Sequence, residues 1–216
     1  MSLQQISTYI DLLLRWNSRI NLTAIRDAEA IVTRHFGESL FLARHLFPME
    51  RRAPSPVPDR NVEERLLSDS SSSSPSAGEV RVLDIGSGAG FPGLPLKIWA
   101  PDINLTLVES NHKKAAFLRV VIRALTLTNV NVITARAETL PGNVPPADVV
   151  TLRAVERFDA VLPITARLLA PTGRLALLIG SSQLPDLACL LPNLRWSAPI
   201  SVPQSLSRVL SIGVPA

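Results

Sequence analysis

Residues 80–93 read Val-Arg-Val-Leu-Asp-Ile-Gly-Ser-Gly-Ala-Gly-Phe-Pro-Gly, and this stretch decides the fold. Its first half is apolar and rich in β-branched residues, which is typical of a buried parallel strand. The glycines that follow allow a sharp turn and let a ligand approach the backbone. Pro92 and Pro95 suit the first turn of a helix. A strand, a glycine turn and a helix form the nucleotide-binding corner of a doubly wound α/β sheet, so we expect a Rossmann-like fold with helices on both faces.

Two classes of cofactor fit this corner. Gly88, Gly90 and Gly93 satisfy the dinucleotide pattern G-x-G-x-x-G, which alone is weakly specific. Asp84 with Gly86, Gly88 and Gly90 gives D-x-G-x-G-x-G, the first motif of methyltransferases that use S-adenosylmethionine. A carboxylate attracts a sulfonium or an ammonium and repels a phosphate. The acid at the end of the strand therefore favours S-adenosylmethionine.

Polar residues follow the later strands of the predicted sheet at the same edge. Glu109 follows the second strand and lies about 20 residues beyond Gly90, the spacing of an acid that binds ribose hydroxyls. A carboxylate there repels a 2′-phosphate and so argues against NADP. Arg136-Ala137-Glu138 follows the third strand, and Arg153 follows the fourth. Ligands of such sheets bind at this edge, so these residues are candidates for the cofactor site.

Three regions are expected along the chain. They are an N-terminal helical extension over residues 1–50, a Pro/Ser-rich flexible insertion or linker over 51–79, and a methyltransferase domain over 80–216. Hydrophobic periodicity predicts helices at 3–19, 27–34, 37–47, 94–99, 113–125, 158–169 and 187–191. After the first strand it predicts further strands at 103–108, 130–135, 147–152, 173–179, 196–202 and 208–212.

Composition narrows the functional classes. With 46% hydrophobic residues, the 216-residue chain can bury a large core, and it carries neither a membrane-length apolar run nor a signal-peptide pattern. We therefore expect a cytoplasmic protein. Its 22 basic residues against 18 acidic ones admit a polyanionic partner. The basic residues near the predicted site are candidate RNA contacts: Lys113, Lys114, Arg119, Arg123 and Arg136.

Several chemistries lack the residues they need. The Tyr-x-x-x-Lys of short-chain dehydrogenases is absent, since the only tyrosine, Tyr9, lies upstream of the glycine turn. Residues 152–155 lack the Asn/Asp-Pro-Pro-aromatic loop often used to methylate amines. Methylation of a pyrimidine carbon needs a cysteine nucleophile, whereas Cys189 lies beyond the sheet and is expected to be a small core residue. His35 and His45 are expected to be structural, and no metal site is expected.

The reaction class that remains is methyl transfer to an atom that is already nucleophilic. Guanine N7 carries an in-plane lone pair and no proton, so it needs no general base. Positioning of the acceptor against the methyl group can then carry catalysis. No catalytic side chain is expected, and Arg153 is the nearest candidate.

At these residues the chain resembles the glucose-inhibited division protein B family, the bacterial 16S rRNA guanine-N7 methyltransferases. The matching stretches are Trp16-Asn17, Asn21-Leu22-Thr23, Arg34-His35-Phe36, Ser39-Leu40, residues 84–93, Glu109-Ser110, Lys113-Lys114, Phe117-Leu118, Asn129-Val130, Arg136-Ala137-Glu138 and Arg153-Ala154-Val155. The resemblance implies a cytoplasmic enzyme that uses S-adenosylmethionine to methylate N7 of guanine 527, in the 530 loop of 16S rRNA. It implies cofactor contacts by Gly86, Phe91, Ala137, Glu138 and Arg153, with Glu109 near the ribose.

The resemblance also predicts partners and shows departures. Free 16S rRNA or the small ribosomal subunit is the expected partner of a monomer that binds no membrane. Glu38 stands where the family usually has aspartate, and Ile179 stands where a lysine is usual. The basic C-terminal end is missing, and residues 53–76 are longer than expected. Two alternatives stay open: a non-catalytic RNA- or ribosome-binding protein with a relict cofactor pocket, and a methyltransferase acting on small molecules.

Overall fold

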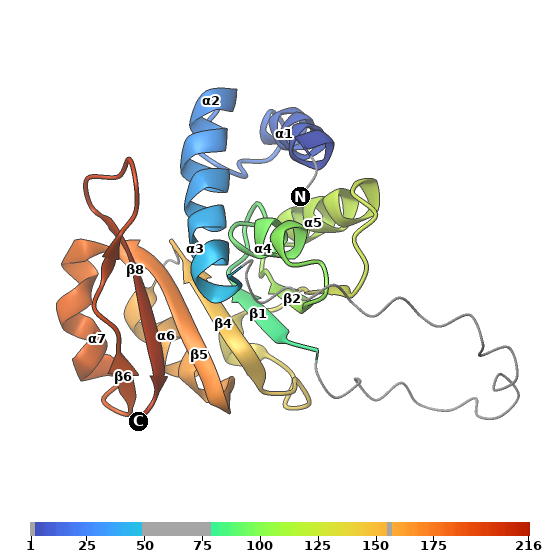
Figure 1. Cartoon of the computed structure of the whole chain (residues 1–216). Helices are drawn as coiled ribbons and strands as arrows, with labels where there is room; N and C mark the ends of the chain where they lie inside the picture. The colour runs from blue at the N-terminus through green and yellow to red at the C-terminus, as the bar shows by residue number, and fades with distance from the viewer. Residues whose placement is uncertain (1–2, 49–78, 155–156) are drawn as a thin grey trace, which may run out of the picture.

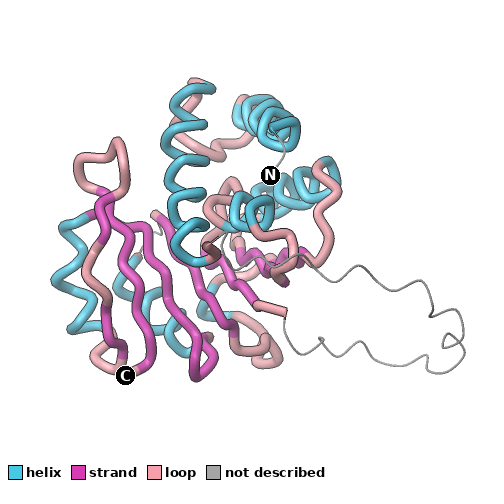
Figure 2. Tube along the Cα trace, in the orientation of Figure 1, coloured by secondary structure: helices cyan, strands magenta, loops and turns pink. Residues whose placement is uncertain are grey.

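One sheet of eight strands forms the centre of the computed structural model, which describes residues 3–48, 79–154 and 157–216 (Figures 1 and 2). The strands follow the order β3-β2-β1-β4-β5-β8-β6, with β7 also paired to β8. The first five strands are parallel, and β8 runs antiparallel to its neighbours. Their bounds are β1 Arg81–Ile85, β2 Asn104–Val108, β3 Val130–Ile133, β4 Ala147–Arg153, β5 Leu169–Gly180, β6 Leu194–Trp196, β7 Ile200–Ser201 and β8 Arg208–Pro215. The predicted insertion at residues 53–76 lies outside the described residues.

Helices cover both faces of the sheet, which confirms the predicted Rossmann-like class (Figure 1). One face carries α1 (Leu3–Asn17), α4 (Gly93–Trp99), α5 (His112–Ala124) and α3 (Glu38–Leu46). The other carries α6 (Phe158–Arg167) and α7 (Leu184–Leu190). Side chains alternate between the faces, so Leu175 and Leu177 of β5 join one core while Ala176 and Leu178 join the other. The described residues also include the short 3₁₀ turns η3 (Ala137–Thr139) and η4 (Ser181–Gln183).

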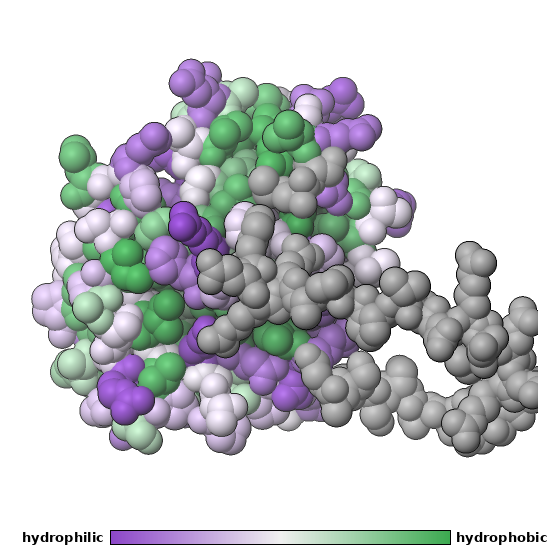
Figure 3. Space-filling view, viewed as in Figure 1, coloured by the Kyte–Doolittle hydropathy of each residue, from purple (hydrophilic) through white to green (hydrophobic). Residues whose placement is uncertain are grey.

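The N-terminal helices share a core with the sheet. Tyr9 and Leu13 of α1 are fully buried and belong to the same apolar cluster as Val82 and Leu105 of the sheet. On the face in view, hydrophobic residues gather at the top between α1 and α2 (Figure 3). The Tyr9 hydroxyl also donates to the Ala89 carbonyl, and this bond fastens α1 to the turn that follows β1.

A single helical rod replaces the two separate helices predicted at 27–34 and 37–47. Asp27 caps it as expected, since its carboxylate accepts the Ala30 N–H at 2.8 Å. The rod then runs through α2 (Ala28–Ala30), the π-helical η1 (Ile31–Gly37) and α3. Gly37 keeps helical dihedral angles and does not break it. A π-helical stretch inside an α-helix often marks a functional site.

The C-terminal part differs from prediction in three places. The strand predicted at 196–202 is divided into β6 and β7, with Pro199, which cannot donate to a ladder, between them. Helix α7 begins at Leu184 because Pro185 suits its first turn. The expectation that Cys189 is a core residue is wrong, since this residue of α7 is exposed. None of the helices among the described residues has the length and apolarity to cross a membrane.

Candidate cofactor and substrate cleft

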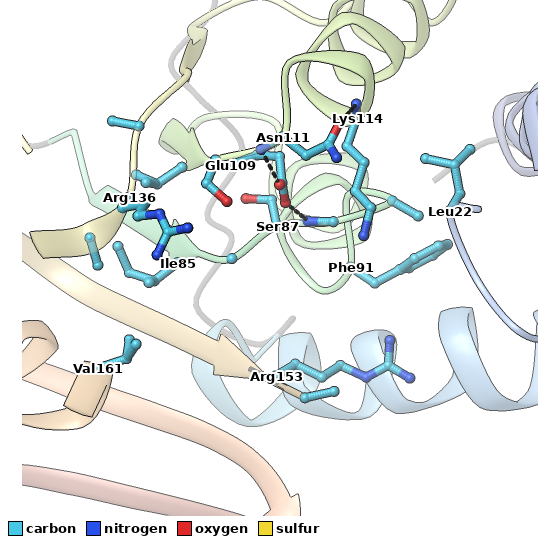
Figure 4. Close-up of a pocket in the computed structure, with 18 of the residues that line it drawn as sticks. Leu22, Ile85, Ser87, Phe91, Glu109, Asn111, Lys114, Arg136, Arg153 and Val161 are labelled. Atoms are coloured by element: carbon cyan, nitrogen blue, oxygen red, sulfur yellow. Dashed lines mark hydrogen bonds between the residues drawn. The ribbon is translucent and has the colours of Figure 1, made fainter. Parts of the chain in front are cut away.

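A cleft of about 590 Å³ opens at the carboxyl ends of the parallel strands, the edge predicted from the sequence (Figure 4). Its walls come from the glycine turn after β1, the ends of β2, β3 and β4, and the N-terminal region. The lining residues are Leu22, Thr23, His35, Ile85–Ala89, Phe91, Val108–Asn111, Lys114, Ala135–Glu138, Arg153, Ala154, Arg157 and Val161. The fold thus brings the N-terminal region and the ends of four strands to one site.

The glycine turn after β1 has a backbone that favours glycine. Gly86, Gly88 and Gly90 have φ angles of 69°, 56° and 94°, in the left-handed region. A Cβ at Gly88 would meet nothing nearer than a carbonyl oxygen at 3.8 Å, so this glycine has open space. A Cβ at Gly90 would lie 2.6 Å from Leu94, so packing also excludes a side chain there. A side chain at Gly88 would therefore occupy open space in the cleft.

The carboxylate of Glu109 is held at the cleft by two backbone donors. Its oxygens accept the N–H of Gly88 at 2.8 Å and the N–H of Asn111 at 2.7 Å (Figure 4). Only 6% of the residue is exposed. Each carboxylate oxygen can accept a second hydrogen bond. The remaining acceptor capacity suits a pair of hydroxyl donors such as a ribose diol.

Asp84 lies beneath the cleft, outside its lining, although the motif predicted that it faces the cofactor. Its carboxyl group is fully buried and accepts Thr151 Oγ1–H at 2.7 Å and Gly93 N–H at 3.3 Å. Burial raises the pKa of Asp84 to about 6, and the hydrogen bonds from Thr151, Ser87 and Gly93 oppose that rise. Asp84 therefore ties β1 to β4 and to the start of α4.

The predicted RNA contacts divide into two groups. Lys114 and Arg136 line the cleft, whereas Lys113 and Arg123 are exposed outside it. Arg119 is also outside the lining and donates to Val132 O at 3.1 Å and Thr134 Oγ1 at 3.0 Å. It therefore fastens α5 to the end of β3. Of the other predicted cofactor contacts, the structure brings Phe91, Ala137, Glu138 and Arg153 to the lining.

Arg153 is held by the helical rod. Its Nε and Nη2 donate to the same oxygen of Glu38 at 3.0 and 2.8 Å, and Nη2 also donates to the Arg34 carbonyl at 3.1 Å. Burial lowers the pKa of Arg153, and the charge of Glu38 opposes that shift. Nη1 makes no hydrogen bond to a described residue. One face of the guanidinium is thus fixed while its other donors remain available to the cleft.

His35 belongs to the lining, which sequence analysis missed by treating it as structural only. Its ring stacks with Phe91 at a centroid distance of 4.8 Å, and its Nε2 lies 2.7 Å from Thr23 Oγ1. Burial, followed by the charges of Arg153, Arg34 and Arg208, lowers the pKa of His35 to about 3. The signal that pointed to His35 and Thr23 was their place in stretches that match the family. His45, by contrast, is outside the lining, and its Nδ1 lies 2.8 Å from the Phe41 carbonyl of the same helix.

Comparison with known proteins gives one consistent family. The model of the family described as rRNA small subunit methyltransferase G matches residues 2–53 and 55–199. A relative named ribosomal RNA small subunit methyltransferase G from Chloroflexus aggregans is 42% identical over 79% of this chain and 63% of its own length. One of the same name from Roseiflexus sp. is 42% identical, again over 79% of this chain and over 65% of its own length. A third, from Chromobacterium violaceum, is 34% identical over 92% of this chain and 81% of its own.

Solved structures share the fold at low sequence identity. A precorrin-6y C5,15-methyltransferase from Geobacter metallireducens is 15% identical, with a TM-score of 0.54 over 64% of this chain and 81% of that one. A SAM dependent methyltransferase from Aquifex aeolicus is 16% identical, with a TM-score of 0.53 over 63% of this chain and 82% of that one. At this identity the likeness establishes the Rossmann-like fold of the sheet region. The chain spans just under two thirds of the length of the Chloroflexus and Roseiflexus relatives.

Proposed function

Since the chain belongs to the rRNA small subunit methyltransferase G family, we propose that it transfers a methyl group from S-adenosylmethionine to N7 of a guanine in 16S rRNA. The proposed target is guanine 527 in the 530 loop. The proposed partner is 16S rRNA or the small ribosomal subunit. Because that substrate is ribosomal RNA, we also propose that the reaction takes place in the cytoplasm. We further propose that the protein acts as a monomer and binds no membrane.

The observation that carries the proposal is the pairing of Gly88 with Glu109. The backbone of the glycine turn donates to the acid at the end of β2 at 2.8 Å, and this leaves open space at Gly88 and spare acceptor capacity on the carboxylate. A ligand with a vicinal diol and no phosphate suits such a site. S-adenosylmethionine has this chemistry, and the cleft of about 590 Å³ is of the size of ligand-binding clefts.

The residues of this cleft would hold the cofactor and the acceptor in position. Glu109 would accept from the ribose hydroxyls, while the turn at Gly86 and Gly88 would leave room for the chain that joins ribose to methionine. Ala137 and Glu138 would line the site beside β3, and Arg153 would face it from the end of β4. When bound, S-adenosylmethionine supplies an electrophilic methyl group on a sulfonium. No side chain needs to remove a proton, because guanine N7 already carries a lone pair.

A methyl-transfer assay tests the proposal. Small ribosomal subunits and free 16S rRNA, both from cells that lack this protein, are incubated with the protein and S-adenosylmethionine. N7-methylguanine is then mapped by mild reduction and aniline cleavage. We expect cleavage at a single guanine of the 530 loop, and the comparison of particles with free RNA identifies the substrate. Association should weaken with salt, because phosphate contacts release counterions.

Two variants make the assay specific. The Gly88→Asp protein should give no cleavage, while Glu29→Ala, an exposed acid on α2, should behave as the wild type. Absence of cleavage with folded wild-type protein on both substrates would contradict the proposal. If the protein binds the subunit without transferring methyl, the non-catalytic alternative replaces it. If the protein methylates a small molecule and not RNA, it is a small-molecule methyltransferase, the second alternative.

A further inference from the structure

Thr23 lines the cleft, and sequence analysis gave it no role. It follows α1 in a short segment that Asn17 holds in place. The Asn17 side-chain oxygen accepts the N–H of Leu22 at 2.9 Å and the N–H of Thr23 at 3.0 Å, and its Nδ2 donates to the Thr23 carbonyl at 2.9 Å. Two of these hydrogen bonds fix the backbone of Thr23, and the third fixes Leu22 before it. Its hydroxyl is consequently a positioned group.

Hydrogen bonds to His35 fix the direction of the bond to Thr23. Arg153 Nη2 lies 3.1 Å from His35 Nδ1 and shares its two protons among Glu38, the Arg34 carbonyl and this nitrogen. An arginine nitrogen cannot accept a hydrogen bond, so a proton on Nδ1 would face a donor, and the contact favours an unprotonated Nδ1. A neutral imidazole with an unprotonated Nδ1 carries its proton on Nε2. This assignment of the tautomer follows from the hydrogen-bond pattern. His35 Nε2–H therefore donates to Thr23 Oγ1, at 2.7 Å.

The hydroxyl of Thr23 has a second donor against it. The N–H of Ile25 donates to Thr23 Oγ1 at 3.1 Å. A hydroxyl oxygen has two acceptor sites, and His35 with Ile25 fills both. The proton of the hydroxyl is left without an acceptor among the described residues. Thr23 is thus a hydrogen-bond donor of fixed direction in the wall of the cleft.

This donor lies on the far side of the glycine turn from Glu109. Thr23 connects through His35 to Arg153 at the end of β4, whereas Glu109 follows β2, and β1 separates these strands in the sheet. In Figure 4, Arg136 is drawn at one side of the cleft, and Leu22, next to Thr23 in the chain, at the other. A cofactor whose ribose binds Glu109 would therefore leave the Thr23 side for the methyl acceptor.

We propose that the Thr23 hydroxyl donates to O6 of the target guanine, an assignment that rests on the proposed function. Guanine presents N7 and O6 side by side, both as acceptors. A donor on O6 orients the base while N7 keeps its lone pair for the methyl group. Adenine presents an amino group in place of O6, so a second donor would face the Thr23 O–H. The hydroxyl would thus select guanine, with His35 and Arg153 as positioning residues.

A cycle of protein and base substitutions tests this assignment. Small subunits are reconstituted with 16S rRNA that carries either guanine or 2-aminopurine at the target position. 2-Aminopurine keeps N7 and lacks O6. The wild-type protein should methylate 2-aminopurine about five- to tenfold more slowly, the effect of one neutral hydrogen bond. Thr23→Val should methylate guanine more slowly by a similar factor and show no further loss with 2-aminopurine.

Control variants separate the hydroxyl from its surroundings. Thr23→Ser keeps the donor and should keep the preference for guanine over 2-aminopurine. His35→Phe removes the donor to Oγ1 and lets the hydroxyl rotate, so it should reduce that preference although Thr23 is present. The affinity of Thr23→Val for S-adenosylmethionine, measured by calorimetry, should equal that of the wild type. A lowered affinity would place Thr23 in the cofactor site and overturn the assignment.

Two failures can be told apart. If the wild-type protein methylates neither guanine-containing particles nor free RNA, the proposed function fails and the Thr23 assignment fails with it. The other failure concerns Thr23 alone. If the wild type methylates guanine, and the change from guanine to 2-aminopurine slows Thr23→Val by the same factor as the wild type, only the Thr23 assignment fails. The Thr23 assignment is therefore overturned if Thr23→Val still prefers guanine over 2-aminopurine by the wild-type factor.

Discussion

Arg153 at the end of β4 and Glu38 at the start of α3 form an ion pair at 2.8 Å, although 115 positions separate them in the chain. Their side chains are only 8% and 5% exposed. Arg208 of β8 approaches the other oxygen of Glu38 at 3.7 Å. The pair therefore joins the helical rod to the edge of the sheet where the cleft opens, and it sets the position of a guanidinium in that cleft.

Breaking this pair should destabilise the protein. Arg153→Met leaves Glu38 buried with only the longer contact to Arg208, and loss of one partner of a buried pair costs about 3–5 kcal/mol of unfolding free energy. The double variant Glu38→Gln with Arg153→Met should lose less than the sum of the two single variants. Urea unfolding of the four proteins measures this. Strictly additive losses would mean that the two groups do not interact.

Removal of the carboxylate of Glu109 should weaken the binding of the cofactor. Hydrogen bonds to charged groups contribute roughly 1.5–3 kcal/mol, so Glu109→Ala should raise the dissociation constant of S-adenosylmethionine by a factor of about 10 to 150. Calorimetry gives the constant directly. Glu29→Ala serves as the matched control, since this acid is exposed on α2 away from the cleft lining. An unchanged constant in Glu109→Ala would place the ribose elsewhere.

A negatively charged side chain introduced at position 88 should block binding of the cofactor without unfolding the protein. Asp and Asn both tolerate left-handed dihedral angles better than other side chains, and a Cβ at Gly88 has space. The Asp side chain would add a charge next to Glu109 and close to where the methionine carboxylate would lie. We expect Gly88→Asp to lose affinity by at least about 100-fold, and Gly88→Asn to lose less. Calorimetry on both folded variants decides; equal losses would assign the effect to bulk alone.

The raised pKa of Asp84 should appear in the pH dependence of stability. The folded state holds its proton up to about pH 6, whereas the unfolded chain releases it near pH 3.8. Between these values the native state binds more protons, so a rise in pH lowers the unfolding free energy, and above pH 6 this contribution is constant. Asp84→Asn does not titrate. Relative to wild type, it should therefore gain up to roughly 3 kcal/mol between pH 4 and pH 7.

Urea unfolding of both proteins at several pH values checks the prediction. The comparison removes the contributions of the other titrating groups, because they are common to both proteins. The amide still accepts from Thr151 but loses the Gly93 donor, so the variant starts from a lower stability at pH 4. Only the change with pH carries the test. Curves that stay parallel from pH 4 to pH 7 would show that Asp84 is ionised in the folded state at pH 4.

The sequence by itself determined the glycine turn, the strand before it and the position of Glu109. These features depend on local rules: glycine for left-handed dihedral angles, β-branched residues for a buried strand, and the fixed place of a residue that follows a strand. It also predicted the cap at Asp27.

The tertiary structure alone decided how the polar groups of the cleft are paired with one another. His35 meets Arg153 across 118 positions, and Asp84 meets Thr151 across 67, so no pattern along the chain reports these pairs. Burial and the hydrogen bond from Thr151 hold Asp84 beneath the cleft, and hydrogen bonds from His35 and Ile25 give the Thr23 hydroxyl its direction. A hydrogen bond has a direction and a polarity that depend on the partner, and the partner is set by packing. The sequence could therefore predict a cofactor-binding corner. Which donors and acceptors of the site pair with one another depends on how the helices pack onto the sheet.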